Sequence, residues 1–416
     1  VRQADRVYGY RNRCPHTGAP LDWTPDRFLD LDGKYIQCAM HAALFRIEDG
    51  YCLAGPCQGD RLTPVALRVE AGLARIAANT YATSALSRMT ATAVDLGEKP
   101  AVPSAIAKYH TTEMARKTIT DAMDIHGGKG VVLGPRNYLG RAWEGIPVSI
   151  TVEGANILTR NLMIFGQGAI RCHPYVLKEM QAARIENPRE RVAQFDDLLF
   201  SHIGYSIRNA VRAFALGLSF GKFASVPHDR KTAKYYQKLT RYSAALAFVS
   251  DVSMLVLGGK LKQKEHLSAR LGDVLSLLYI TSAMLKRYEA QGRPAADQAI
   301  LAWAFHDAIY QIQIALHKVV DNFPSKPMRP LLRFVVFPFG RREREPGDRL
   351  THRVAQLMLT PSDTRDRLCQ GVFTSSESGH PVNTMEDALP LVIQAEPLER
   401  KLLKALKKGM IGGITW

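Results

Sequence analysis

The sequence predicts a multidomain protein in which a small all-β domain is followed by an all-α domain and a further helical extension. The length of 416 residues exceeds what one hydrophobic core ordinarily holds. Residues 1–78 contain short alternating segments, such as KYIQCAM, ALFRIEDG and TPVALRVEAGLARI, separated by Gly, Pro and Asp, which is typical of strands. From about residue 84 the apolar residues recur with a helical period, so the boundary is expected near AANTYATS, residues 77–84.

The helical part is expected to begin with a helix over about 103–125 and to continue with amphipathic helices over 190–320. Five prolines within residues 323–349 predict a break there. The longest apolar run, residues 243–259, is interrupted by Asp251 and is shorter than the roughly 20 residues of a membrane span. With no signal peptide pattern, we expect a cytoplasmic protein, with a peripheral position at the inner membrane as an open alternative.

The chain is basic, with 55 Lys and Arg against 39 Asp and Glu and a formal charge of +16. Such a surface suits a phosphorylated ligand or an anionic membrane surface as well as simple solvation. The basic segments KLKQKEH (260–266) and RFVVFPFGRRER (333–344) are the places where those partners would bind. No nucleic acid partner is expected, because no DNA- or RNA-binding motif accompanies the charge. Six scattered cysteines do not form a disulfide framework and indicate a reducing compartment.

Two cysteine–histidine pairs stand out in the β-rich part. Cys14 and His16 lie in NRCPHTGAPLDW, and Cys38 and His41 follow in QCAMHAALF. Two short pairs on loops can enclose a metal site, either a tetrahedral zinc or a two-iron cluster with thiolates on one iron and imidazoles on the other. Each loop supplies one residue of each type, which favours the cluster.

These residues resemble the Rieske iron–sulfur family, in which the ligand loops read C-x-H and C-x-x-H. CPHTGAP and CAMHAALF fit this pattern, with Phe45 as the following aromatic and GYCLAGP as the next loop. The resemblance implies a [2Fe-2S] domain over residues 1–80, of the ferredoxin or oxygenase type and without the family's first strand. Ala19 and Met40 occupy the positions of the disulfide cysteines in respiratory Rieske proteins. Cys52 and Cys57 are expected to be ordinary small buried residues.

A glycine loop and a carboxylate mark the helical part. DIHGGKG contains Gly127, Gly128 and Gly130, which let the backbone turn and approach a ligand, although helix capping alone would explain them. Glu153 is the only acid between residues 145 and 160. Apolar surroundings disfavour a charged carboxylate and bring it toward the strength of a base, whereas an isolated motif would indicate a surface glutamate.

HGGKG, Arg141 and VEGANILTR resemble the C-terminal helical domain of acyl-CoA dehydrogenases. The similarity implies such a domain, in part, over 84–172 and the helical extension of the long bacterial enzymes over 173–416. It also implies that the glycine loop binds FAD, commonly across a subunit interface of a homo-oligomer. Glu153 would remove the α-proton of a fatty acyl-CoA, giving trans-2-enoyl-CoA in fatty acid β-oxidation. Cys172 and His173 are assigned to packing.

Three hypotheses remain open. The first is an acyl-CoA dehydrogenase with a Rieske domain joined by gene fusion or by an artefact of gene prediction, incomplete as this chain alone. The second is a Rieske electron-transfer protein that serves a flavin partner. The third is a non-catalytic helical scaffold at a membrane.

Overall fold

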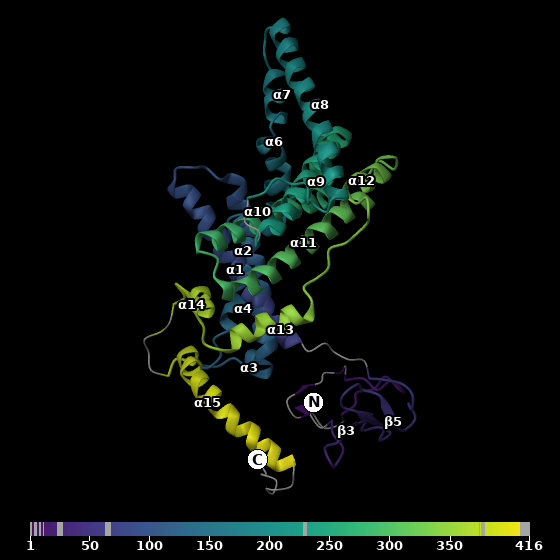
Figure 1. Cartoon of the computed structure of the whole chain (residues 1–416), viewed down its shortest axis with the longest axis vertical. Coiled ribbons are helices and arrows are strands. Elements are labelled where there is room, and N and C mark those ends of the chain that lie inside the picture. Colours follow the sequence, from purple (N-terminus) through teal and green to yellow (C-terminus); the bar gives the residue numbers. More distant parts are fainter. Residues whose placement is uncertain are drawn as a thin grey trace. The chain divides into compact units, whose positions relative to one another are not determined.

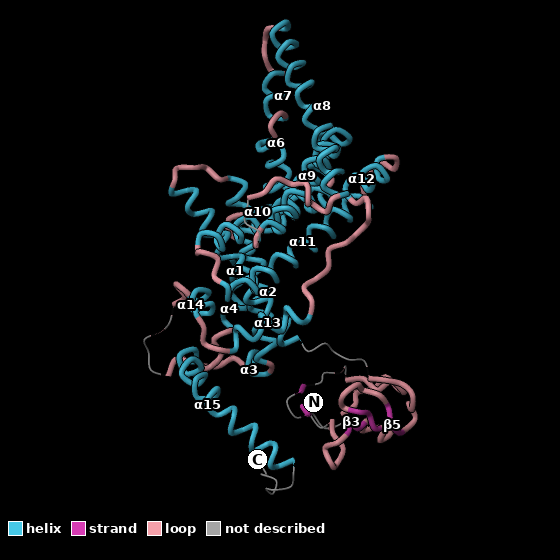
Figure 2. The backbone as a smooth tube through the Cα atoms, in the orientation of Figure 1, coloured by secondary structure: helices cyan, strands magenta, loops and turns pink. Residues whose placement is uncertain are grey.

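The computed structural model describes residues 2–3, 6–7, 10, 12–22, 28–62, 68–227, 231–373, 375 and 379–407. The chain divides into two compact units, one formed by Val1–Gly72 with Thr374–Trp416 and the other by Leu73–Phe373. Figure 1 shows the strands near the N-terminus and the helices that follow, and Figure 2 colours the same trace by secondary structure.

The β-rich unit contains a three-stranded antiparallel sheet in the order β3 (Tyr35–Gln37), β4 (Leu44–Arg46), β5 (Cys52–Ala54). Ile36 pairs with Phe45, which pairs in turn with Cys52, and all three are buried. Leu21, Ile47 and Leu62 complete this small core. Two short strands, β1 (Arg2–Gln3) and β2 (Arg6–Val7), pair separately, and the helix α15 (Pro381–Lys407) belongs to the same unit.

The first helix begins earlier than the sequence predicts. Helix α1 covers Arg68–Asp95, so the strand expected over TPVALRVEAGLARI is wrong from residue 68 onward, and residues 63–67 lie outside the described part. The boundary expected at residues 77–84 falls inside this helix. The buried side chains of α1 recur every three or four residues, which is the period of a helix and not the alternation of a strand. They are Ala74, Ala77, Ala78, Tyr81, Ala82, Ala85 and Leu86.

The second unit is helical. Its remaining elements are α2 (Ala101–His126), α3 (Gly128–Val131), α4 (Gly140–Thr151), α5 (Asn156–Leu158), the π-helix η1 (Thr159–Gln167), α6 (Gly168–Cys172), α7 (Val176–Ala182), α8 (Pro188–Leu218), α9 (Ala233–Leu257), η2 (Gly258–Gln263), α10 (Glu265–Ala290), η3 (Ala295–Asp297), α11 (Gln298–Asp321), α12 (Met328–Val336), α13 (Asp348–Leu359) and α14 (Asp363–Cys369). The break that the prolines predict over 323–349 is shorter than expected, because helix α12 occupies part of that segment.

Helices α9, α10 and α11 form the centre of this unit, with α10 packed against α11, α9 and η1. Helix α8 begins at a strong cap, because the Asn187 side chain accepts hydrogen bonds from the backbone N–H groups of Arg189 and Glu190, and Pro188 occupies the first helical position. Figure 1 shows α7 and the start of α8 running side by side away from the central helices. Their packing places residues from α7, α8 and α9 around one pocket.

Within the described residues, Ala233–Gln263 is the one segment that is long and apolar enough for a membrane span. Of its apolar window, 56% is buried inside the protein, as in the core helix of a helical bundle. Length and composition are therefore weak evidence for a span here.

Candidate functional sites

The two cysteine–histidine loops have the same backbone geometry. In the first loop the N–H of Cys14 donates to the carbonyl of Ala19 (2.8 Å), and the carbonyl of Cys14 accepts from Gly18 (2.8 Å). In the second loop Cys38 makes the matching bonds with Ala43 (2.9 Å) and Ala42 (2.8 Å). The residue four positions after each cysteine has a positive φ, 74° at Gly18 and 51° at Ala42. Each loop therefore turns back tightly enough to present its cysteine and histidine together.

The thiols and imidazoles of these loops differ in exposure. Cys14 and Cys38 are buried, whereas His16 and His41 are exposed. The two imidazole rings are neighbours, with centroids 5.0 Å apart. The structure thus brings the two predicted imidazole ligands together on the surface and places the two predicted thiol ligands in the buried core of the same unit.

This arrangement fits two irons better than one zinc. A tetrahedral ion with bonds of about 2.0–2.3 Å would hold all four ligand atoms within roughly 4 Å of one another. Within the described part of the chain, these four residues are not among the groups of three or more whose ligand atoms all lie within 4.8 Å. Separate pairs of thiolates and imidazoles are what a Rieske cluster requires.

A third loop closes against the second ligand loop. At Gly55 the φ angle is 109°, and a Cβ there would lie 2.7 Å from the Cα of Ala43. Cys52 and Cys57 are buried as predicted, and their Sγ atoms are 3.2 Å apart. Burial, together with the neighbouring thiols of Cys52 and Cys14, raises the pKa of Cys57 well above its ordinary value. Cys57 is therefore a protonated packing residue beside the thiol of Cys14.

The glycine loop lies where helix α2 ends. Gly127 has a φ of 58° and caps the helix, with its N–H donating to the carbonyl of Met123 (3.0 Å). A Cβ at Gly127 or Gly128 would meet no atom within 4 Å, so the outer side of the loop is open. Gly130 is buried, and a Cβ there would lie 2.9 Å from the carbonyl oxygen of Met123, so packing alone accounts for it. Gly127 and Gly128 thus leave room for a ligand.

Glu153 occupies a strained turn between α4 and α5. Its φ is 56°, a conformation that costs a residue with a side chain roughly 1 kcal/mol, and Gly154 follows with a φ of 101°. The ammonium of Lys108, on α2, holds the turn by donating to the carbonyl of Gly154 (2.6 Å) and to Oδ1 of Asn156 (2.7 Å). The Nδ2 of the buried Asn156 donates in turn to Glu113 Oε1 (2.8 Å).

The surroundings of Glu153 differ from those that the sequence indicates. Its side chain is exposed, so burial within this chain does not desolvate the carboxylate. Large apolar side chains within ten residues of it are exposed as well: Trp143, Val148, Val152, Ile157 and Leu158. The apolar sequence around Glu153 therefore forms surface, of the kind that usually contacts another domain or subunit.

His173, which we assign to packing together with Cys172, belongs to a group of polar side chains, whereas Cys172 is exposed. The Nε2 of His173 lies 2.9 Å from Oδ1 of Asp251, and His202 lies beside both. Their potential ligand atoms all lie within 4.8 Å of one another. Sequence reasoning missed this group because its members are up to 78 positions apart. The one available signal was Asp251, the only charged residue in the apolar run 243–259.

Comparison with known proteins defines the class of each part of the chain. Residues 1–73 match the Rieske [2Fe-2S] domain, residues 68–165 match the C-terminal domain of acyl-CoA dehydrogenases, and residues 170–416 match the acyl-CoA dehydrogenase C-terminal domain of bacterial type. The chain therefore belongs to the acyl-CoA dehydrogenase family and carries an N-terminal Rieske domain.

One similar structure is the crystal structure of an acyl-CoA dehydrogenase complexed with FAD from Bacillus anthracis. It superimposes with a TM-score of 0.50 and 14% sequence identity, over 72% of this chain and 48% of that one. At this identity the likeness concerns the fold. The present chain spans about half the length of that structure.

Proposed function

We propose that this chain supplies the C-terminal helical part of an FAD-dependent acyl-CoA dehydrogenase, which oxidises fatty acyl-CoA to trans-2-enoyl-CoA in fatty acid β-oxidation. The observation that carries the proposal is the strained turn that presents Glu153 and that hydrogen bonds from Lys108 hold in place. Backbone strain at a residue that another helix holds in place is typical of catalytic positions. Family membership over residues 68–165 and 170–416 supports the same activity.

In this proposal Glu153 takes the α-proton of the acyl thioester on one carboxylate oxygen. The FAD-complexed relative supports FAD as the cofactor, and bound FAD would accept the β-hydride. Gly127 and Gly128 would lie against FAD, because their outer sides are open. The exposed apolar residues near Glu153 would meet the domain or subunit that completes the site and excludes water. A homo-oligomer is one source of that surface.

The Rieske domain gives a second candidate function, transfer of electrons to or from a flavin partner. Cys14 and Cys38 would hold the inner iron, and His16 and His41 the outer one. The exposure of both imidazoles supports this role, because it would bring the outer iron near the surface where a partner docks. We also propose a cytoplasmic location, with the exposed Lys260, Lys262 and Lys264 available to coenzyme A phosphates or an anionic inner-membrane surface.

The dehydrogenase proposal is tested by turnover of the full chain with added FAD, a fatty acyl-CoA and an artificial electron acceptor. The variant Glu153→Gln should retain the fold and lose about 10²–10⁴-fold in rate, as expected for removal of a general base. Glu144→Gln is the matched control, because Glu144 is an exposed acid on the neighbouring helix α4. Equal rates for the two variants would refute the role of Glu153, and a lack of any turnover would refute activity of this chain alone.

The electron-transfer proposal is tested separately. Protein reconstituted with iron and sulfide should show visible absorption and, after reduction, an electron paramagnetic resonance signal. Both should disappear in His41→Gln. Protein that takes up no iron and shows neither signal after reconstitution would contradict the cluster.

A further inference from the structure

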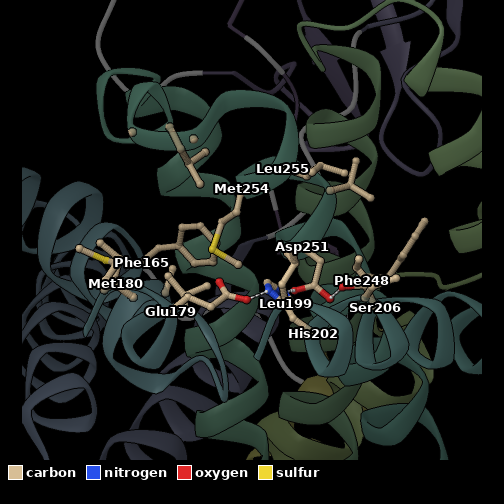
Figure 3. A pocket seen from close by; sticks show the side chains of 18 of the residues that line it. Phe165, Glu179, Met180, Leu199, His202, Ser206, Phe248, Asp251, Met254 and Leu255 are labelled. Carbon is tan, nitrogen blue, oxygen red and sulfur yellow. Dashed lines mark hydrogen bonds and ion pairs between the residues drawn. The ribbon is translucent and has the colours of Figure 1, made fainter. Parts of the chain in front are cut away.

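A cluster of polar side chains lies on the wall of a largely apolar cavity of about 980 Å³ in the helical unit, which Lys262 also lines. Figure 3 shows Glu179, His202, Asp251 and Ser206 in a row, with the apolar side chains of Met254 and Leu255 above them. Helix α7 supplies Glu179, helix α8 supplies His202 and Ser206, and helix α9 supplies Asp251. No part of the proposed dehydrogenase or cluster chemistry uses these residues.

The hydrogen bonds of the cluster show which ring nitrogen of each histidine carries the proton. His202 Nδ1 lies 2.8 Å from Oε1 of Glu179, and because a carboxylate accepts, Nδ1 carries the proton. Asp251 accepts twice, from Ser206 Oγ at Oδ2 (2.9 Å) and from His173 Nε2 at Oδ1 (2.9 Å). The Nδ1 of His173 accepts from the backbone N–H groups that follow it, so its Nε2 is the protonated nitrogen.

This arrangement leaves two electron-rich atoms facing each other. In neutral His202 the Nε2 atom bears a lone pair, and it lies 3.9 Å from Oδ1 of Asp251. That separation is too long for a hydrogen bond. The side chains of both residues are largely buried, at 18% and 4% exposure, so water screens them little. A cation between the two atoms would remove the repulsion.

We propose that His202 Nε2 and Asp251 Oδ1 bind a divalent transition metal ion, with Zn²⁺ as the best match. The two atoms are 3.9 Å apart, slightly less than two zinc bonds of about 2.0–2.2 Å laid end to end, so a closing movement of roughly 0.5 Å would bring them to the spacing of tetrahedral zinc ligands. Borderline imidazole and carboxylate ligands suit this ion. Because the cavity lies beside the two ligands, the remaining coordination positions take water or a Lewis base of a bound molecule.

The neighbouring side chains are those that a metal site needs. A ligating histidine usually donates its other ring N–H to a carboxylate, and Glu179 accepts that proton here. A ligating carboxylate is usually held by hydrogen bonds, and Ser206 and His173 provide them. Glu179, Ser206 and His173 are therefore positioning residues, which orient the two ligands.

The competing arrangement places a second proton on His202 instead of a metal ion, making an imidazolium between Glu179 and Asp251. Such a group would fasten helix α8 between α7 and α9 and would bind no zinc. The two arrangements differ in zinc stoichiometry.

The test uses the full chain, dialysed against chelator-buffered Zn²⁺, with zinc and iron measured per chain by elemental analysis. Because the Rieske ligands can also take zinc, the informative quantity is the difference between wild type and variant. Wild type should bind one zinc ion more per chain than His202→Gln. His317→Gln is the matched control and should bind as wild type, because His317 pairs with Asp321 on another helix, α11.

A second variant distinguishes positioning from folding. Glu179→Gln should weaken zinc binding about 10–100-fold without changing the number of zinc ions at saturation. Circular dichroism confirms that each variant is folded. Equal zinc content in wild type and folded His202→Gln, or superimposable zinc titrations for wild type and Glu179→Gln, would overturn the proposal. The result does not depend on dehydrogenase turnover.

Discussion

Lys108 is the residue on which the geometry of the Glu153 turn depends. Its ammonium donates to Gly154 O at 2.6 Å and Asn156 Oδ1 at 2.7 Å, with a weaker contact to Ile150 O at 3.3 Å. Lys108→Met keeps the apolar stem and removes all three contacts. We expect the turn to loosen, because Asn156 is 3% exposed and its oxygen would lose its only recorded donor within the described structure.

The size of the effect follows from the two short bonds. A hydrogen bond that involves a charged group contributes about 1.5–3 kcal/mol, and the half-buried position of Lys108 favours the lower value. Two such bonds at the lower value give about 3 kcal/mol, which the release of backbone strain reduces to a net loss of about 2–3 kcal/mol. Part of the cost of the left-handed Glu153 conformation, roughly 1 kcal/mol, would be released when the turn opens.

Amide hydrogen exchange measures this local opening directly. A loss of about 2–3 kcal/mol corresponds to roughly 30–150-fold faster exchange in the segment 152–160. Lys117→Met is the matched control, because Lys117 is an exposed lysine on the same helix. Exchange in Lys108→Met that matches the control would refute the idea that this lysine holds the turn.

Two further predictions concern stability and the metal loops. The buried Nε2 of His110 has no hydrogen-bond partner in the described structure, and desolvation followed by the charge of Arg160 lowers its pKa to about 3. Only the unfolded chain then takes up a proton near pH 6.5, so stability falls as the pH falls below that value. Between pH 7.5 and 5.5 the wild type should lose about 1.4 kcal/mol more unfolding free energy in urea than His110→Leu. In the β-rich unit, Gly55→Ala should push Cβ against Ala43 and lower the yield of reconstituted cluster, measured by visible absorption.

A specific result would contradict each of these two predictions. Parallel pH profiles for wild type and His110→Leu would show that His110 is protonated in the folded protein. For the loop, Gly59→Ala is the matched control, since Gly59 has a φ of 96° but open space around its Cβ position. Equal cluster yields in Gly55→Ala and Gly59→Ala would mean that any loss of cluster comes from backbone strain at a positive φ and not from contact between the new Cβ and Ala43.

Much of the Rieske site could be predicted because its signals are local. Cys14 with His16 and Cys38 with His41 are each two or three residues apart, so a single turn brings each pair together whatever the rest of the fold does. The change from strands to helices was also visible, but its position was not. In the short segment after residue 68, the alternation of a strand and the spacing of a helix look alike. Burial of Ala74, Ala77 and Tyr81 against the helical core stabilises the helix there.

The sequence by itself therefore determined the class of each part, through short motifs whose chemistry depends on nearest neighbours: the paired ligands, the glycine loop and the glutamate before Gly154. Tertiary structure alone decided that Lys108 holds the Glu153 turn from 46 positions away and that Glu153 is exposed. It also decided that His202 and Asp251 face each other beside a cavity. Those outcomes depend on which faces of distant helices pack together, and every amphipathic helix offers several partners that spacing in the sequence does not distinguish.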